Sequence, residues 1–155
     1  MTTLQERVVH TARGWLGTRF HHQGRLKKTD KHTGGVDCLG LLVGVAAELD
    51  LETVRGEPIA MFDKATYTHT PDILALKNTL AHILFAIPPG DMSVGDVVLM
   101  NIDGRAQHMG IITDIAGKKG IIHAYAPAHA VVEHILDSYW QERIVAVFRL
   151  PSYNN

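Results

Sequence analysis

Two kinds of apolar periodicity divide the chain into a helical first half and a strand-rich second half. In the first half, apolar residues recur at intervals of three and four, which predicts amphipathic helices. The exception follows Cys38, where a nearly unbroken apolar run predicts a buried helix. Gly17 is expected to end the first helix and Asp72 to cap the third. The three predicted helices span residues 3–16, 38 to 49 or 51, and 72–85.

The second half consists of short runs that are rich in β-branched residues and separated by turn signals. Their close spacing favours an antiparallel meander, because parallel strands need long crossover connections. Helices followed by strands predict a single α+β domain over residues 1–155, with the N-terminal helices packed on one face of an antiparallel sheet of about five strands. The predicted strands cover residues 95–102, 108–115, 120–126, 130–136 and 144–150.

Composition narrows the classes of function. The 155 residues include 15 Lys and Arg against 16 Asp and Glu, and no basic stripe indicates nucleic-acid binding. No apolar run approaches the roughly 20 residues of a membrane span, so no membrane partner is expected. One cysteine cannot form an internal disulfide. The N-terminal segment lacks the pattern of a secretory signal, which predicts synthesis in the cytoplasm and a separate route of delivery.

Cys38 stands at the predicted start of the buried helix, directly after Asp37, a residue type that caps helices. Unpaired backbone N–H groups and the helix dipole stabilise negative charge at such a position, so we expect a lowered pKa for the thiol. A thiol of this kind is typical of a nucleophilic cysteine. The alternative is that Cys38 is a small buried apolar residue, as free cysteines often are.

A thiol nucleophile needs a base within hydrogen-bond reach, and the base needs a group that orients it. Of the ten histidines, His108 opens the second predicted strand and His123 lies in the next one, so the two side chains can share a face of the sheet. In that arrangement His108 accepts the thiol proton and His123 holds its other ring nitrogen. The alternative is that both are structural residues of the sheet, bonded to backbone or water.

Four motifs, taken together and in order, resemble those of the NlpC-type cell-wall cysteine peptidases. They are Asp37-Cys38-Leu39-Gly40, Gly95-Asp96, His108-Met109-Gly110-Ile111, and His123. The resemblance covers about residues 12–126 and implies a compact papain-like fold. The upstream run GTRFHHQGR further resembles the subgroup found in phage tails and gene-transfer particles.

By position, the resemblance implies that Cys38 is the nucleophile, His108 the general base and acid, and His123 the orienting third residue. The backbone N–H of Cys38 is expected to help bind the oxyanion, because donors at a helix start suit that task. Gly40 is expected to let the helix pack closely against a neighbouring segment.

Further substrate-binding residues are predicted on the long loop that precedes the nucleophile. His22 and Gln23 are candidates for a second oxyanion donor and Asp37 for an ionic contact, with a solvated loop and helix capping as the alternatives. Many family members carry Ser after the Cys and Tyr in the upstream loop, which together with the Asp hold a free amino terminus of the substrate. Here Leu39 and Phe20 occupy those positions, and their side chains cannot form hydrogen bonds.

The resemblance implies a thiol hydrolase that cleaves an amide bond of peptidoglycan stem peptides, with the D-glutamyl–diaminopimelate link as the expected bond. No cofactor is implied, and phage tail proteins are the expected partners, with the protein carried on a virion tail or encoded by a prophage. The alternative is a catalytically silent structural or assembly protein of a phage tail tip.

A metal site is a third hypothesis. No metal is expected, because the paired-ligand motifs that hold structural or catalytic zinc, such as C-x-x-C and H-E-x-x-H, are missing from the sequence. The candidate ligands would be His21, His22, His32, Cys38, His108 and His123.

Overall fold

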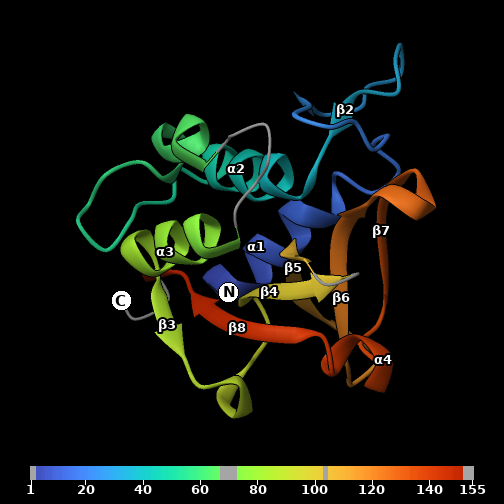
Figure 1. Cartoon of the computed structure of the whole chain (residues 1–155). Coiled ribbons are helices and arrows are strands. Elements are labelled where there is room, and N and C mark those ends of the chain that lie inside the picture. Colours follow the sequence, from blue (N-terminus) through green and yellow to red (C-terminus); the bar gives the residue numbers. More distant parts are fainter. Residues whose placement is uncertain (1–2, 67–72, 103–104, 152–155) are drawn as a thin grey trace.

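The computed structural model describes residues 3–66, 73–102 and 105–151 (Figure 1). Its helices are α1 (Leu4–Arg13), α2 (Cys38–Glu48), α3 (Ile73–Ile83) and α4 (Ser138–Gln141), with 3-10 turns η1 (Ile59–Thr66), η2 (Pro89–Asp91) and η3 (Ala126–Ala128). Its strands are β1 (Arg25–Leu26), β2 (Gly35–Val36), β3 (Phe85–Ile87), β4 (Val97–Ile102), β5 (Arg105–Ile115), β6 (Lys118–Tyr125), β7 (Ala130–Ile135) and β8 (Ile144–Arg149). Within the described ranges, no helix has the length and apolar character needed to cross a membrane.

All three predicted helices are present, with shorter ends. Helix α1 begins at a capping box formed by Thr3 and Glu6, which satisfies two backbone N–H groups at the helix start. It ends with Gly14 as C-cap rather than at the predicted Gly17. Helix α3 ends at Ile83, because the following residues pair with β8 as strand β3. The predicted cap of α3, Asp72, lies outside the described residues.

Six strands form the main sheet in the order β3-β8-β4-β5-β6-β7, and every neighbouring pair is antiparallel. The five predicted strands are all present, and β3 is the sixth. The meander holds from β4 to β7, but β8 returns to pair with β4 instead of continuing beyond β7. Strands β4 and β8 run across the view while β6 and β7 run up and down it, so the sheet is strongly twisted (Figure 1).

The position of β4 explains this return. The side chains of Val97, Val98, Leu99 and Met100 are all buried, although they alternate between the two faces of the sheet. A strand that is apolar on both faces needs a cover on each face and a partner on each edge, and β8 supplies the second partner.

Helices α1, α2 and α3 pack over one face of the sheet, as predicted (Figure 1). The other face is also buried, which the prediction of helices on one face did not include. There an apolar cluster joins Val98 of β4, Ile112 of β5 and Ile121 of β6 to Trp140 of the short helix α4. The twisted sheet therefore encloses a second, smaller core on the side away from the long helices.

The Gly95-Asp96 motif forms the turn into β4. Gly95 has φ +90°, a conformation that favours glycine. The fully buried Asp96 carboxylate accepts hydrogen bonds from Nε and Nη2 of Arg149, both at 2.9 Å, and from the backbone N–H of Ser93 at 2.8 Å. This motif therefore fastens the end of β8 to the start of β4, and its role is structural.

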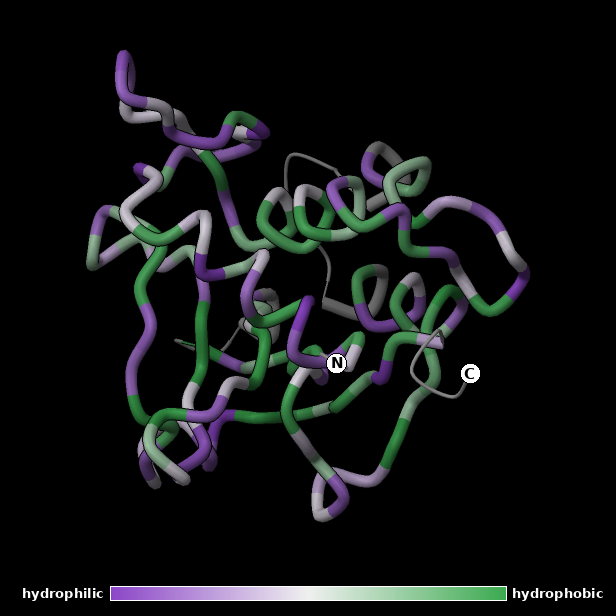
Figure 2. Tube along the Cα trace, turned by 180° about the vertical axis from the view of Figure 1, so that it is seen from behind, coloured by the Kyte–Doolittle hydropathy of each residue, from purple (hydrophilic) through white to green (hydrophobic). Residues whose placement is uncertain are grey.

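Residues 17–36, predicted as a loop, contain the small β1–β2 sheet and bridge two parts of the molecule. Arg19 pairs with Ala130 at the start of β7, and the next residue, Phe20, pairs with Val36 just before α2. The turn between β1 and β2 projects from the body of the protein and is mostly hydrophilic (Figure 2).

Helix α2 packs against Trp15, in the segment that follows α1, through a glycine that leaves no room for a larger residue. A Cβ atom on Gly44 would lie 2.2 Å from Cζ2 of the buried Trp15. We predict that Gly44→Ala lowers the free energy of unfolding by about 1–2 kcal/mol, because the overlap outweighs the helix propensity of alanine. Urea denaturation measures the change. The control is Gly90→Ala, where a Cβ meets nothing within 4 Å and the expected change is below about 0.5 kcal/mol; equal effects of the two substitutions would contradict the packing account.

Candidate active site

Cys38 is the first residue of α2, as the sequence predicts, and Asp37 is the N-cap. The side chain of Cys38 is half-buried and lies against the main apolar core. Its sulfur accepts hydrogen bonds from the backbone N–H groups of Leu39 and Met109. Met109 directly follows His108, so the fold brings the start of α2 to the part of β5 that carries the predicted base.

The structure joins the two predicted histidines directly. His108 on β5 and His123 on β6 contact each other through Nε2 and Nδ1, 2.5 Å apart. The backbone pairing of β5 with β6 ends at Ile111 and Ile122, before either histidine is reached. Beyond that point side chains rather than the backbone connect the two strands. His123 is fully buried, whereas His108 is half-buried.

The electrostatics of the thiol differ from the sequence expectation. Burial, and to a smaller extent the adjacent Asp37 carboxylate, raise the pKa of the Cys38 thiol to about 11. Hydrogen bonds from the Met109 and Leu39 N–H groups, together with the charge of Arg25, act in the opposite direction but are smaller effects. The predicted lowering by the helix start is therefore wrong for the resting site, because desolvation outweighs the helix dipole.

Both imidazoles are held in the neutral form. Burial lowers the pKa of His108 to about 4. Burial, together with the neighbouring His108 and His134, lowers the pKa of His123 to about 2. At neutral pH the resting site thus contains an uncharged thiol and uncharged rings, the state in which an imidazole can act as a base.

Three residues that the sequence analysis did not assign to the site surround His123. The Tyr125 ring stacks on it at 5.1 Å between centroids and 19° between planes, and Trp140 meets it edge-on at 5.0 Å. His134 on β7 contacts its Nε2 at 2.9 Å. Trp140 also packs against the His134 ring, with the centroids 5.1 Å apart. Strand alternation places Tyr125 on the face of His123, and this was the available signal.

Asp37 is engaged by the chain itself. One carboxylate oxygen accepts the Gly40 N–H at 2.8 Å and Nη1 of Arg25 at 2.9 Å, and the other accepts the Gln23 N–H at 2.9 Å. Asp37 is also buried. The alternative role of helix capping is the one the structure shows, and a contact with substrate stays a prediction.

His22 and Gln23, the two candidates for a second oxyanion donor, lie on the segment that contacts Asp37. Gln23 has φ +60° and uses its backbone N–H on Asp37, which takes that group away from an oxyanion. His22 is exposed, and its carbonyl oxygen lies 2.9 Å from Nδ1 of His21. The predicted close packing at Gly40 is confirmed, because a Cβ there would lie 2.4 Å from the carbonyl oxygen of Gly24.

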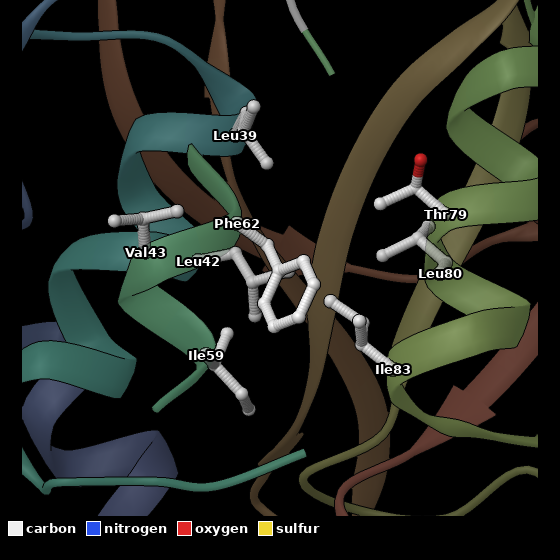
Figure 3. A pocket seen from close by; sticks show the side chains of 8 residues that line it. All are labelled: Leu39, Leu42, Val43, Ile59, Phe62, Thr79, Leu80 and Ile83. Atoms are coloured by element: carbon white, nitrogen blue, oxygen red, sulfur yellow. The ribbon is translucent and has the colours of Figure 1, made fainter. Parts of the chain in front are cut away.

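An apolar pocket that includes Leu39, the residue after Cys38, lies between α2, η1 and α3 (Figure 3). Phe62 of η1 projects between side chains of α2 and α3, and Leu39 stands at one end of the pocket. The space inside is about 10 Å³, which is close to the minimum for one water molecule. The pocket is therefore a packing gap, and Leu39 contributes to the core as its apolar side chain requires. The lining residues are Leu39, Leu42, Val43, Ile59, Phe62, Thr79, Leu80 and Ile83.

Among the residues that the structure describes, no group of three or more His, Cys, Asp or Glu side chains is arranged to hold a metal ion. The groups on these neighbouring segments are a thiol at the start of α2 and a neutral imidazole on β5, and the chemistry open to such groups is proton transfer coupled to nucleophilic attack.

A comparison with protein-family models matches residues 17–149 to the NlpC/P60 family. The chain belongs to that family. It is therefore an enzyme of the cysteine peptidase class, and the hydrolysis of cell-wall amide bonds is the general activity. The resemblance drawn from the four sequence motifs is confirmed at the level of the family, and no curated protein matched the chain.

Solved structures of other proteins share the fold. The NlpC/p60 domain of the peptidoglycan hydrolase SagA is 17% identical with a TM-score of 0.59, over 94% of this chain and 98% of that one. NlpC2 from Trichomonas vaginalis is 17% identical with a TM-score of 0.62, over 97% of this chain but 47% of its own. An N-acetylmuramoyl-L-alanine amidase from Bacteroides uniformis is 12% identical with a TM-score of 0.54, over 94% and 98%. The papain-like α+β architecture is thus that of the NlpC/P60 family.

The buried neutral histidines make stability depend on pH. In the unfolded chain a histidine binds a proton near pH 6.5, whereas folded His108 and His123 do so near 4 and 2. The unfolded state therefore binds more protons below pH 6.5, and stability is lost as the pH falls. We predict a decrease of up to about 1.4 kcal/mol per pH unit for each imidazole, measured by urea denaturation between pH 6.5 and 5. His123→Gln should reduce this slope and His10→Gln should not; equal slopes in all three proteins would contradict the assignment.

The raised thiol pKa predicts a slow reaction of Cys38 at neutral pH. The rate of carbamidomethylation by iodoacetamide should rise about tenfold per pH unit from pH 7 to 10, because only the thiolate reacts. Asp37→Asn keeps a helix-capping side chain but removes the negative charge, so its rate profile should move to lower pH. Mass spectrometry of the labelled protein follows both rates, and a wild-type plateau below pH 8 would show that the thiol is not protonated at rest.

Proposed function

We propose that this chain hydrolyses an amide bond of peptidoglycan stem peptides, with Cys38 as nucleophile, His108 as general base and acid, and His123 as the residue that orients His108. The observation that carries the proposal is the junction of α2 with β5. The Met109 N–H reaches the Cys38 sulfur, and the preceding residue, His108, holds His123 through its Nε2 atom. Membership of the NlpC/P60 family supports the same class of reaction.

Acylation begins with attack of the Cys38 sulfur on the carbonyl carbon of the scissile amide. The thiol proton passes to Nδ1 of His108, since Nε2 is occupied by His123. The resulting tetrahedral oxyanion is stabilised by backbone N–H groups at the start of α2. When the C–N bond breaks, the proton on His108 passes to the leaving amine, and the acyl group remains on sulfur as a thioester.

Deacylation repeats these steps with water. His108 takes a proton from the water as its oxygen attacks the thioester carbon, and it returns that proton to the departing sulfur. The product is a free carboxylic acid, and the thiol of Cys38 is regenerated. No step requires a redox change or a second substrate other than water.

The neutral resting state determines when the proton moves. With the Cys38 pKa raised to about 11 and the His108 pKa lowered to about 4, an ion pair is disfavoured before substrate binds. The proton is therefore transferred from the sulfur to His108 as the C–S bond forms, while negative charge develops on the substrate oxygen. This makes the orientation of His108 more important than the nucleophilicity of a free thiolate.

We place the scissile bond at the D-glutamyl–diaminopimelate link, in keeping with the resemblance to NlpC-type peptidases. The ion pair between Arg25 and Asp37 limits the part that the Asp37 carboxylate can take in holding the substrate. Because the Asp37 carboxylate already binds a guanidinium, it does not offer an unshared charge to a substrate ammonium group. We therefore expect turnover of stem peptides that are still attached to glycan strands.

We further propose that the enzyme acts from a phage tail or a related particle. The support is the likeness of the segment GTRFHHQGR to that subgroup, and this segment leads into the projecting β1–β2 turn (Figure 2). A tail-tip protein without turnover is the alternative, and the slow labelling expected of Cys38 does not separate the two. Turnover of peptidoglycan decides between them.

The test is release of soluble fragments from isolated peptidoglycan, analysed by mass spectrometry. We predict measurable turnover by the wild type and by the control His10→Gln. Cys38→Ala should lose it to background, and His123→Ala should retain no more than about a hundredth, in line with the 10²–10⁴-fold that general acid–base catalysis contributes. Activity that survives Cys38→Ala removes Cys38 as the nucleophile, and an inactive but folded wild type favours the tail-tip alternative.

A further inference from the structure

The contact between His108 and His123 is part of a longer chain of imidazoles. His134, on the edge strand β7, brings its Nε2 to 2.9 Å from Nε2 of His123. Its other nitrogen, Nδ1, lies 2.9 Å from the carbonyl oxygen of Ile135. In the β6–β7 pairing His123 faces Val132, so His134 is its diagonal neighbour two residues further along β7.

The Ile135 carbonyl fixes the direction of every hydrogen bond in this chain. A carbonyl oxygen only accepts, so the proton of neutral His134 must be on Nδ1 and its Nε2 carries a lone pair. That lone pair requires a proton on Nε2 of His123, which leaves the lone pair of His123 on Nδ1. Nδ1 of His123 in turn requires a proton on Nε2 of His108. His108 then carries its own lone pair on Nδ1, the nitrogen needed to receive the thiol proton.

We propose that His134 is a positioning residue that sets the tautomers of His123 and His108, so that the catalytic unit comprises Cys38 and three histidines anchored at the Ile135 carbonyl. The inference rests on the proposed function. A buried His123 without an acceptor at Nε2 would lose one of its two hydrogen bonds. The two tautomers of His123 would then differ less in energy. In the tautomer with the proton on Nδ1, two N–H groups would face each other, and the hydrogen bond from Nε2–H of His108 would be lost.

The surroundings keep this chain in place. The Trp140 ring lies against both His123 and His134, with centroids at 5.0 and 5.1 Å. The Tyr125 ring stacks on His123. His134 is itself half-buried, at the boundary between this aromatic cluster and the solvent. Its rotation is therefore restricted by packing, and the hydrogen bonds select which nitrogen is protonated.

The test compares two substitutions of similar size. His134→Gln keeps an acceptor that can reach the Nε2–H of His123, whereas His134→Leu removes it. We expect kcat on peptidoglycan fragments to fall at least about tenfold in His134→Leu and to stay within about threefold of wild type in His134→Gln, with KM changed little in both. His10→Gln, on the exposed face of α1, is the control for histidine substitution.

A spectroscopic measurement tests the tautomers without relying on turnover. In protein labelled with ¹⁵N at histidine, the ring nitrogen shifts of wild type at pH 7.5 should show His123 protonated on Nε2, and His134→Leu should show a mixture. Protonation of His123 on Nδ1 in wild type overturns the proposal. Equal losses of kcat in His134→Leu and His134→Gln, accompanied by lower melting temperatures, also overturn it, because they indicate a structural role. If the wild type shows no turnover, the proposed function fails, and the tautomer result still decides this inference.

Discussion

The Asp37 carboxylate holds together the part of the structure on which the active site depends. It caps α2 through the Gly40 N–H and binds the Gln23 N–H and the Arg25 guanidinium. These contacts place the first turn of α2, and with it Cys38, at a defined point between the upstream segment and the sheet. The same negative charge raises the pKa of the neighbouring thiol. The residue that positions Cys38, the proposed nucleophile, therefore adds to the effect of burial in keeping the thiol protonated, and the charge of Arg25 acts in the opposite direction.

In the proposed mechanism, a protonated thiol makes the reaction depend on the protonation state and orientation of the histidines. In a preformed thiolate–imidazolium pair the base has accepted the thiol proton before the substrate binds. In this site, His108 must accept that proton during the attack. This requires the His108 ring to be neutral and correctly oriented at that moment. Burial provides the neutrality, since it lowers the pKa of both rings, and the contact with His123 provides the orientation. The aromatic cover of Tyr125 and Trp140 contributes to both, because it excludes water and restricts rotation.

Sequence patterns were sufficient for the three long helices, for five strands of the main sheet and for the approach of His108 to His123. Strand alternation and the motif order predicted that His108 and His123 meet, because both depend on local periodicity and on neighbouring strands of a meander. The return of β8 to β4 and the second core beneath Trp140 were missed, since they follow from the twist of the whole sheet. The sign of the Cys38 pKa shift was missed for a similar reason. A helix start is visible in sequence, but the desolvation that opposes it arises only from tertiary packing.

His134 and the segment of residues 17–25 show how distant parts of the chain cooperate in this fold. The Gly17 N–H binds the Val131 carbonyl, and the Phe20 N–H binds that of His129, so the segment runs along the start of β7. Its far end reaches Asp37 through the Gln23 N–H. The segment thus links the strand that carries His134 to the residue that caps the nucleophile helix. The imidazole chain from His134 to His108, together with the Met109 contact with Cys38, is a second connection between β7 and α2. A displacement of α2 relative to the histidines would strain both connections. The position of Cys38 relative to the histidines can therefore be well defined even though a long irregular segment precedes α2.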